Sequence, residues 1–186
     1  GDWSSDVCSS DLYLRPIKSS LESNIQQNLK YDSNITTIAR IGDEQCMFHL
    51  SYMKRLQTFE TIFGKDNLIV RPFKRKGLLG ECVVSDFCHT LGIRLRPEFV
   101  LRRNESMSAE AVKMLYCFNA FIRTSAHPSL AGNQLMLSHL DALTGETFHL
   151  HSCFLLGIQT HIEAENEMIL KRYGIDLYED LHRHDE

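Results

Sequence analysis

The feature that most constrains the fold is a short apolar run that reaches an arginine and then gives way to a helical pattern. Tyr13 and Leu14 precede Arg15, and Pro16 suits the first turn of a helix because its missing N–H needs no partner there. The next apolar residues recur every four positions, at Ile17, Leu21, Ile25 and Leu29. This spacing predicts a strand that is followed directly by an amphipathic helix.

The same stretch carries the donors of a phosphate site. Arg15 ends the apolar run, and Ser23 lies eight residues later, in the first turns of the predicted helix. An arginine supplies a planar fork of donors and a fixed charge, a serine supplies a neutral donor, and a helix start adds unpaired N–H groups. Arg15 and Ser23 could bind one anion, although a solvated arginine and a surface serine fit the same spacing.

Residues 1–12 (GDWSSDVCSSDL) resemble the in-frame translation of a sequencing-library adapter. The likeness runs from Asp2 to Leu12 without a gap, and it implies an artefactual segment in front of a gene that continues upstream. We therefore expect residues 1–12 to carry no fold information. We expect residues 13–186 to be a C-terminal fragment.

Charge and cysteine content exclude several classes of protein. The chain has 20 Lys+Arg and 24 Asp+Glu; without the three aspartates of residues 1–12 the difference falls to one negative charge, which argues against nucleic-acid binding. No run of 18 apolar residues occurs, so no membrane span is expected. Five cysteines remain beyond residue 12, irregularly spaced and without a CxxC pair. This pattern favours free thiols, a reducing compartment and hence a cytoplasmic location, and it predicts no disulfide framework and no metal site.

The order of the remaining patterns predicts an α/β fold with a parallel sheet. The β-branched run at 68–70 indicates a buried strand that ends at Pro72, and a basic loop follows over residues 74–80. From residue 93 onward the patterns are helical, with Ser106 or Ser108 as the N-cap of the first helix. The predicted helices are 48–63, 81–91, a helix from about 108, 133–143 and 152–173, with a loosely packed tail over 176–186. The helix over 81–91 is expected to bury its apolar residues, Val83, Val84, Phe87, Cys88 and Leu91.

Three segments resemble bacterial sulfotransferase-like proteins of the P-loop class, which take a sulfuryl group from 3′-phosphoadenosine 5′-phosphosulfate (PAPS). They are residues 13–30 (YLRPIKSSLESNIQQNLK), residues 63–93 (FGKDNLIVRPFKRKGLLGECVVSDFCHTLGI), and residues 104–119 (NESMSAEAVKMLYCFN) together with 165–173. The segments match in order and in spacing. The resemblance implies a truncated three-layer α/β fold with few parallel strands and a mostly helical C-terminal half, as part of one domain over residues 13–186.

Carried onto this chain, the resemblance makes Arg15 and Ser23 the ligands of the 3′-phosphate of PAPS. At position 16 the chain has proline where family members often carry a charged or polar residue. No glycine-rich phosphate loop occurs in residues 13–186, and in this family that loop and the catalytic base lie upstream. The catalytic residues are therefore unassigned, and we expect the fragment itself to be inactive.

Two classes of function remain open. The first is an enzyme fragment that transfers a sulfuryl group to a hydroxyl of a carbohydrate or another small molecule. The second is a non-catalytic α/β module that binds a nucleotide or a glycan.

Two further clusters have open interpretations. The basic loop from Arg71 to Lys76 could bind the cofactor or an anionic acceptor, or it could be solvated. His149, His151 and Cys153 alternate, so a strand would present all three on one face, but a metal would need a fourth ligand.

Overall fold

The computed structural model describes residues 10–31, 40–96, 98, 100, 106–124 and 136–182. The chain forms two compact units, which we call the sheet unit and the helical unit and describe separately. The sheet unit comprises Gly1–Ile17, Met47–Arg102 and Gln159–Glu179, and the helical unit comprises Lys18–Cys46, Arg103–Ile158 and Asp180–Glu186. The described part of the chain is mixed α/β and mostly helical.

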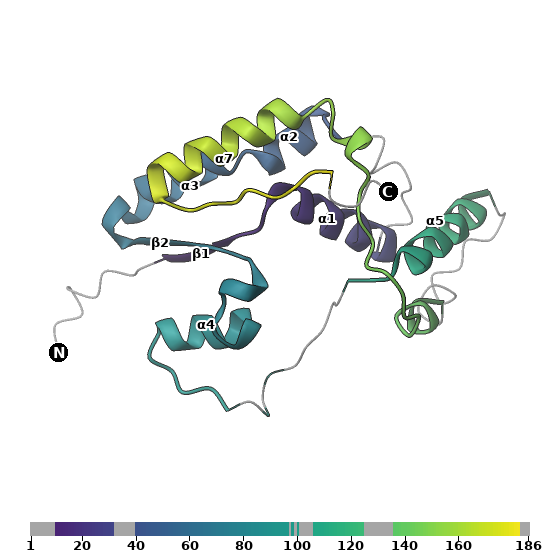
Figure 1. Ribbon diagram of the computed structural model, residues 1–186, viewed down its shortest axis with the longest axis horizontal. Helices are drawn as coiled ribbons and strands as arrows, with labels where there is room; N and C mark the ends of the chain where they lie inside the picture. Colours follow the sequence, from purple (N-terminus) through teal and green to yellow (C-terminus); the bar gives the residue numbers. More distant parts are fainter. Residues whose placement is uncertain are drawn as a thin grey trace. The chain divides into compact units, whose positions relative to one another are not determined.

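A two-stranded parallel sheet lies at the centre of the sheet unit (Figure 1). Strand β1 (Ser10–Leu14) pairs with β2 (Leu68–Pro72), in a register that sets Ser10 opposite Leu68 and Leu14 opposite Pro72. The Phe73 N–H continues the ladder by donating to the Leu14 carbonyl at 2.7 Å. The prediction of a strand that ends at Pro72 is confirmed.

Strand β1 begins at Ser10, inside the segment that resembles an adapter translation. Neighbouring strands are held together by backbone N–H and C=O groups, which almost every residue type has. The pairing of residues 10–12 therefore does not decide whether they belong to the adapter-like segment. The assignment of residues 1–12 as artefactual and of 13–186 as one domain stays a prediction.

Two helices of the sheet unit lie side by side, α3 (Tyr52–Phe63) and α7 (Gln159–Tyr173) (Figure 1). The buried Glu165 carboxylate on α7 accepts the Met53 N–H at the start of α3 at 2.9 Å. An anion placed there satisfies one of the unpaired donors of the helix start. Glu165 thus caps the start of α3, because the side chain of the N-cap residue Ser51 makes no capping hydrogen bond.

The prediction of one helix over 48–63 is wrong, because the chain breaks at Ser51 into α2 (Glu44–Leu50) and α3. The Ser51 hydroxyl donates to the Met47 carbonyl at 2.8 Å, the local bond with which serine competes against helix continuation. The predicted end of the helix is confirmed. Gly64 follows it with a φ of 82°, and its N–H donates to the Glu60 carbonyl.

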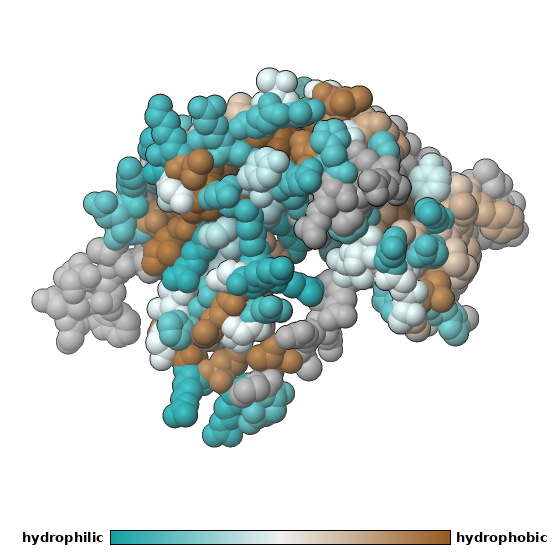
Figure 2. All heavy atoms as spheres, viewed as in Figure 1, coloured by the Kyte–Doolittle hydropathy of each residue, from teal (hydrophilic) through white to brown (hydrophobic). Residues whose placement is uncertain are grey.

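Helix α4 (Val83–Thr90) turns a different face inward from the one its apolar residues predict. Val84, Phe87 and Leu91 are exposed, whereas the acidic Asp86 is buried. Figure 2 shows hydrophobic side chains at the surface in the area of α4. The prediction that these apolar residues are buried is therefore wrong, because hydrogen bonds of Asp86 set the rotation of the helix.

The helical unit contains most of α1 (Ile17–Tyr31) and α5 (Ala109–Thr124). The four-residue stripe of α1 is buried throughout, with exposed fractions between 1% and 5%, so the predicted helix is confirmed. Ser108 caps α5, because its hydroxyl oxygen accepts the Ala111 N–H at 3.2 Å. The fully buried Asn119 of α5 donates to the Leu29 carbonyl at 2.8 Å and ties the two helices together.

The C-terminal third also departs from the sequence pattern. In place of one helix over 152–173, a single 3₁₀ turn (Ser152–Phe154) precedes α7, which begins at Gln159. In the described part of the predicted tail, Leu177 is buried and Tyr178 is 69% exposed. Residues 136–140 are helical, and the predicted start of that helix at 133 lies outside the described residues. No helix among the described residues has the length and apolar character needed to cross a membrane.

Candidate anion-binding site

Arg15 follows the carboxyl end of β1 and is held there by two aromatic side chains. Its guanidinium lies over the ring of Phe73, 4.7 Å from the ring centroid, and its carbonyl accepts the Tyr52 hydroxyl at 2.9 Å. Stacking of this kind fixes the plane of a guanidinium without using its N–H donors. Within the described residues Arg15 forms no ion pair, so the charge is available to an anion.

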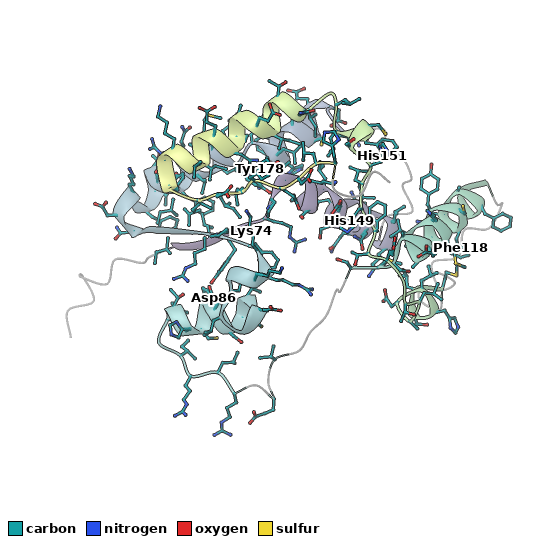
Figure 3. The ribbon with its side chains drawn as sticks, in the orientation of Figure 1. Lys74, Asp86, Phe118, His149, His151 and Tyr178 are labelled. Atoms are coloured by element: carbon teal, nitrogen blue, oxygen red, sulfur yellow. The ribbon has the colours of Figure 1, made fainter. Side chains whose placement is uncertain are left out.

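A basic loop follows the carboxyl end of the neighbouring strand. After β2, Lys74 leads into a 3₁₀ turn (Arg75–Gly77) and a second one (Leu79–Glu81). The Lys74 ammonium donates to the Tyr178 carbonyl at 3.0 Å, and Figure 3 labels both residues in the sheet unit. Arg75 and Lys76 are exposed and form no ion pair with any described residue.

The carboxyl ends of parallel strands meet at one edge of a sheet, where ligands of open α/β folds bind. Arg15 lies at that edge after β1, and the loop lies at the same edge after β2. We call the four cations Arg15, Lys74, Arg75 and Lys76 the basic edge. Its charge and its unused guanidinium donors fit a phosphate group.

Asp86 on α4, labelled in Figure 3, joins both strands to the basic loop through its hydrogen bonds. One carboxylate oxygen accepts the Tyr13 hydroxyl of β1 at 2.7 Å and the Arg71 guanidinium of β2 at 3.2 Å. The other oxygen accepts the Leu79 N–H of the loop at 3.0 Å. The Leu79 N–H, the Tyr13 hydroxyl and the Arg71 charge together hold the pKa of Asp86 below its ordinary value despite burial.

The loop contains a strained backbone position close to the Asp86 contact. Gly80 and Glu81 both have positive φ, 61° and 55°, and glutamate has a side chain that disfavours this region. Such a conformation persists only where surrounding contacts determine it. The hydrogen bond from the Leu79 N–H to Asp86 is one of those contacts.

Ser23, the other predicted ligand, lies on α1 in the helical unit and is half-buried. Its hydroxyl makes no hydrogen bond with any described residue, which leaves it free to donate. Arg15 belongs to the sheet unit, so the two residues are described in different units. The convergence of Arg15 and Ser23 on one anion stays a prediction.

The residue before Ser23 is a buried glutamate that sequence reasoning did not single out. Glu22 accepts the Leu150 N–H at 2.9 Å and lies 3.3 Å from Nδ1 of His149. Burial raises the pKa of Glu22, and the Leu150 N–H and His149 counter part of that rise. The only sign of Glu22 in the sequence is its position next to Leu21 of the apolar stripe. That position does not indicate that Leu150 and His149 are its partners.

The alternating His149, His151 and Cys153 do not form a strand face. His149 contacts Glu22, and Nδ1 of His151 accepts the Cys153 N–H at 3.1 Å as that chain segment enters a 3₁₀ turn. Across the described part of the chain no group of three or more His, Cys, Asp or Glu side chains is arranged to hold a metal ion.

Asp86 was likewise missed as a site residue. The signal that could have found it is the single carboxylate in the predicted helical stretch 83–91, shortly after a basic loop. Comparison of the chain with family models, with curated proteins and with solved structures finds no match.

Proposed function

We propose that the chain is part of a sulfotransferase-like protein and that it binds the 3′-phosphate of PAPS through Arg15 and Ser23. The observation that carries the proposal is the placement of the Arg15 guanidinium and its lack of an ion pair with a described residue. Its guanidinium is stacked on Phe73 at the carboxyl end of a parallel strand, and it forms no ion pair with a described residue. A fixed, uncompensated guanidinium at this edge is what recognition of a phosphate dianion requires.

The roles of the two residues follow from their donors. The Arg15 guanidinium would bind two phosphate oxygens with parallel N–H bonds, and the Ser23 hydroxyl would donate one neutral hydrogen bond. Lys74, Arg75 and Lys76 add positive potential to the same edge as Arg15. Bound PAPS would supply the activated sulfuryl group, and the acceptor would be a hydroxyl of a carbohydrate or another small molecule. We expect the chain alone to bind the nucleotide without catalysing transfer, because no glycine-rich phosphate loop occurs in residues 13–186.

The experiment is a titration of the 186-residue chain with adenosine 3′,5′-bisphosphate, followed by NMR chemical shifts. Arg15→Ala should weaken binding about tenfold or more, because a charge-assisted pair of hydrogen bonds is lost. Arg55→Ala is the matched control, since Arg55 also stacks on an aromatic ring, that of Tyr52 at 4.9 Å, in the same unit. This control should bind as the unaltered chain does.

Ser23→Ala tests the second ligand, with a smaller expected loss of about three- to tenfold for one hydrogen bond. Ser20→Ala is its control, because Ser20 is a half-buried serine on the same helix. Equal affinities for the unaltered chain and Arg15→Ala would contradict the site assignment.

A further inference from the structure

We propose that Asp86 is the positioning residue of the basic edge, holding the loop that carries Arg75 and Lys76 against both strands so that their charges face the ligand of Arg15. The inference rests on the proposed function for its ligand. It concerns a residue that neither the phosphate contacts nor the family resemblance assigns. Asp86 itself contacts no phosphate in this account and acts only through the loop.

The geometry of the Asp86 carboxylate supports this role because its donors come from three separate segments. Tyr13 lies 73 positions earlier in the chain, on β1, and Arg71 lies on β2. The Leu79 N–H lies at the start of the second 3₁₀ turn of the loop. One buried side chain thus fixes the distance between the strand ends and the loop backbone.

A carboxylate suits this position better than a neutral side chain. Its two oxygens accept three donors here, one of them an arginine with a permanent charge. An asparagine has a single carbonyl oxygen for these donors, and its amide N–H groups would face other donors. Asp86→Asn therefore keeps the side-chain volume and loses part of the attachment.

The neighbouring backbone strain adds an independent observation. Glu81 has a φ of 55°, a conformation that a loop without external contacts would relax. Lys74 is also attached, through its bond to the Tyr178 carbonyl. The loop is therefore anchored at Lys74 and at Leu79, and the exposed Arg75 and Lys76 lie between these two anchors.

The test measures adenosine 3′,5′-bisphosphate affinity and amide hydrogen exchange of residues 75–81 in the same variants. Asp86→Asn should weaken binding about fivefold and speed exchange across 75–81 about tenfold. Tyr13→Phe removes one donor and keeps the carboxylate, so it should weaken binding about twofold. The control is Ile169→Val in the core of the same unit, where Ile169 is 0% exposed.

The control lowers stability without touching the loop, so its affinity and its exchange at 75–81 should equal those of the unaltered chain. If Asp86→Asn binds within twofold of the unaltered chain while Arg15→Ala loses affinity, the positioning role is overturned and the proposed function stands. If Arg15→Ala has no effect, the proposed function fails. In that case exchange decides the positioning role alone: faster exchange at 75–81 supports it, and unchanged exchange overturns it.

Discussion

Each of the two units buries a carboxylate that accepts a backbone N–H from another segment of the chain. The pKa values of these two carboxylates are nevertheless shifted in opposite directions. Asp86 of the sheet unit accepts the Leu79 N–H at 3.0 Å, and Glu22 of the helical unit accepts the Leu150 N–H at 2.9 Å. The pKa of Asp86 is lowered, whereas the pKa of Glu22 is raised. The difference lies in how the effect of burial on each pKa compares with the effects of the hydrogen bonds and charges around it.

The Leu79 N–H, followed by the Tyr13 hydroxyl and the Arg71 charge, lowers the pKa of Asp86, and together they outweigh the effect of burial. For Glu22 burial is the largest effect, and the attraction of His149 and Lys18 does not offset it. Two buried carboxylates with similar backbone bonds therefore play different parts. The charge of Asp86 stabilises the loop beside the basic edge. The charge of Glu22, by contrast, lowers the stability of the folded state, because α1 buries this carboxylate.

The largest expected effect comes from deleting the Asp86 carboxylate. Asp86→Ala leaves the Leu79 N–H, the Tyr13 hydroxyl and the Arg71 guanidinium without their acceptor, so the free energy of unfolding should fall by about 2–3 kcal/mol. Asp86→Asn keeps one acceptor and should lose about half as much. Urea denaturation followed by circular dichroism measures both. Equal stability of Asp86→Ala and the unaltered chain would remove the contrast between the two carboxylates.

The next effect is a pH dependence of opposite sign in the two units. Because the folded-state pKa of Glu22 is raised, its contribution to stability is fully present below pH 4.5 and is lost as pH rises through the folded value. Asp86, with a lowered pKa, contributes stability above about pH 3.8 that is lost as pH falls further. Glu22→Gln should therefore gain stability relative to the unaltered chain between pH 4 and pH 7.

The measurement is urea denaturation of the unaltered chain and of Glu22→Gln at several pH values. Asp86→Asn serves as the comparison, since its stability relative to the unaltered chain should improve as pH falls from 5 to 3. A Glu22→Gln variant that loses relative stability as pH rises would reverse the assignment for Glu22.

The smallest effect concerns the strain in the basic loop. Glycine adopts a φ of 55° without the steric cost that glutamate has, so Glu81→Gly should stabilise the fold by at most about 1 kcal/mol, with part of the gain offset in the unfolded state. Thermal unfolding measures the change. As a matched control, Glu163→Gly at an exposed position of α7 should destabilise, because glycine weakens a helix interior.

Local patterns predicted the elements whose stabilising contacts are visible in the sequence. The four-residue stripe that begins at Ile17 predicted α1, and all four of its apolar residues are buried. The apolar run at 68–70 predicted β2, in which Leu68 is buried. The inward face of α4 could not be predicted in this way. It depends on Asp86 and on Tyr13, which lies 73 positions away in the sequence.

The candidate site was predictable to a similar extent. The sequence indicated Arg15 as a strand-end cation, and the structure describes it there, stacked on Phe73. The ring that fixes its plane, and the Tyr52 hydroxyl on its carbonyl, come from other elements and left no local signal. The pairing of Arg15 with Ser23 on one anion, which both the spacing of the residues and the family resemblance suggested, stays a prediction.

Whether Arg15 binds the 3′-phosphate is tested most directly by comparing two nucleotides that differ only in that group, adenosine 3′,5′-bisphosphate and adenosine 5′-monophosphate. We expect the chain to prefer the bisphosphate by about tenfold or more, Arg15→Ala to lose most of this preference, and Arg55→Ala to keep it. The same preference in Arg15→Ala as in the unaltered chain would contradict the assignment of Arg15 to the 3′-phosphate.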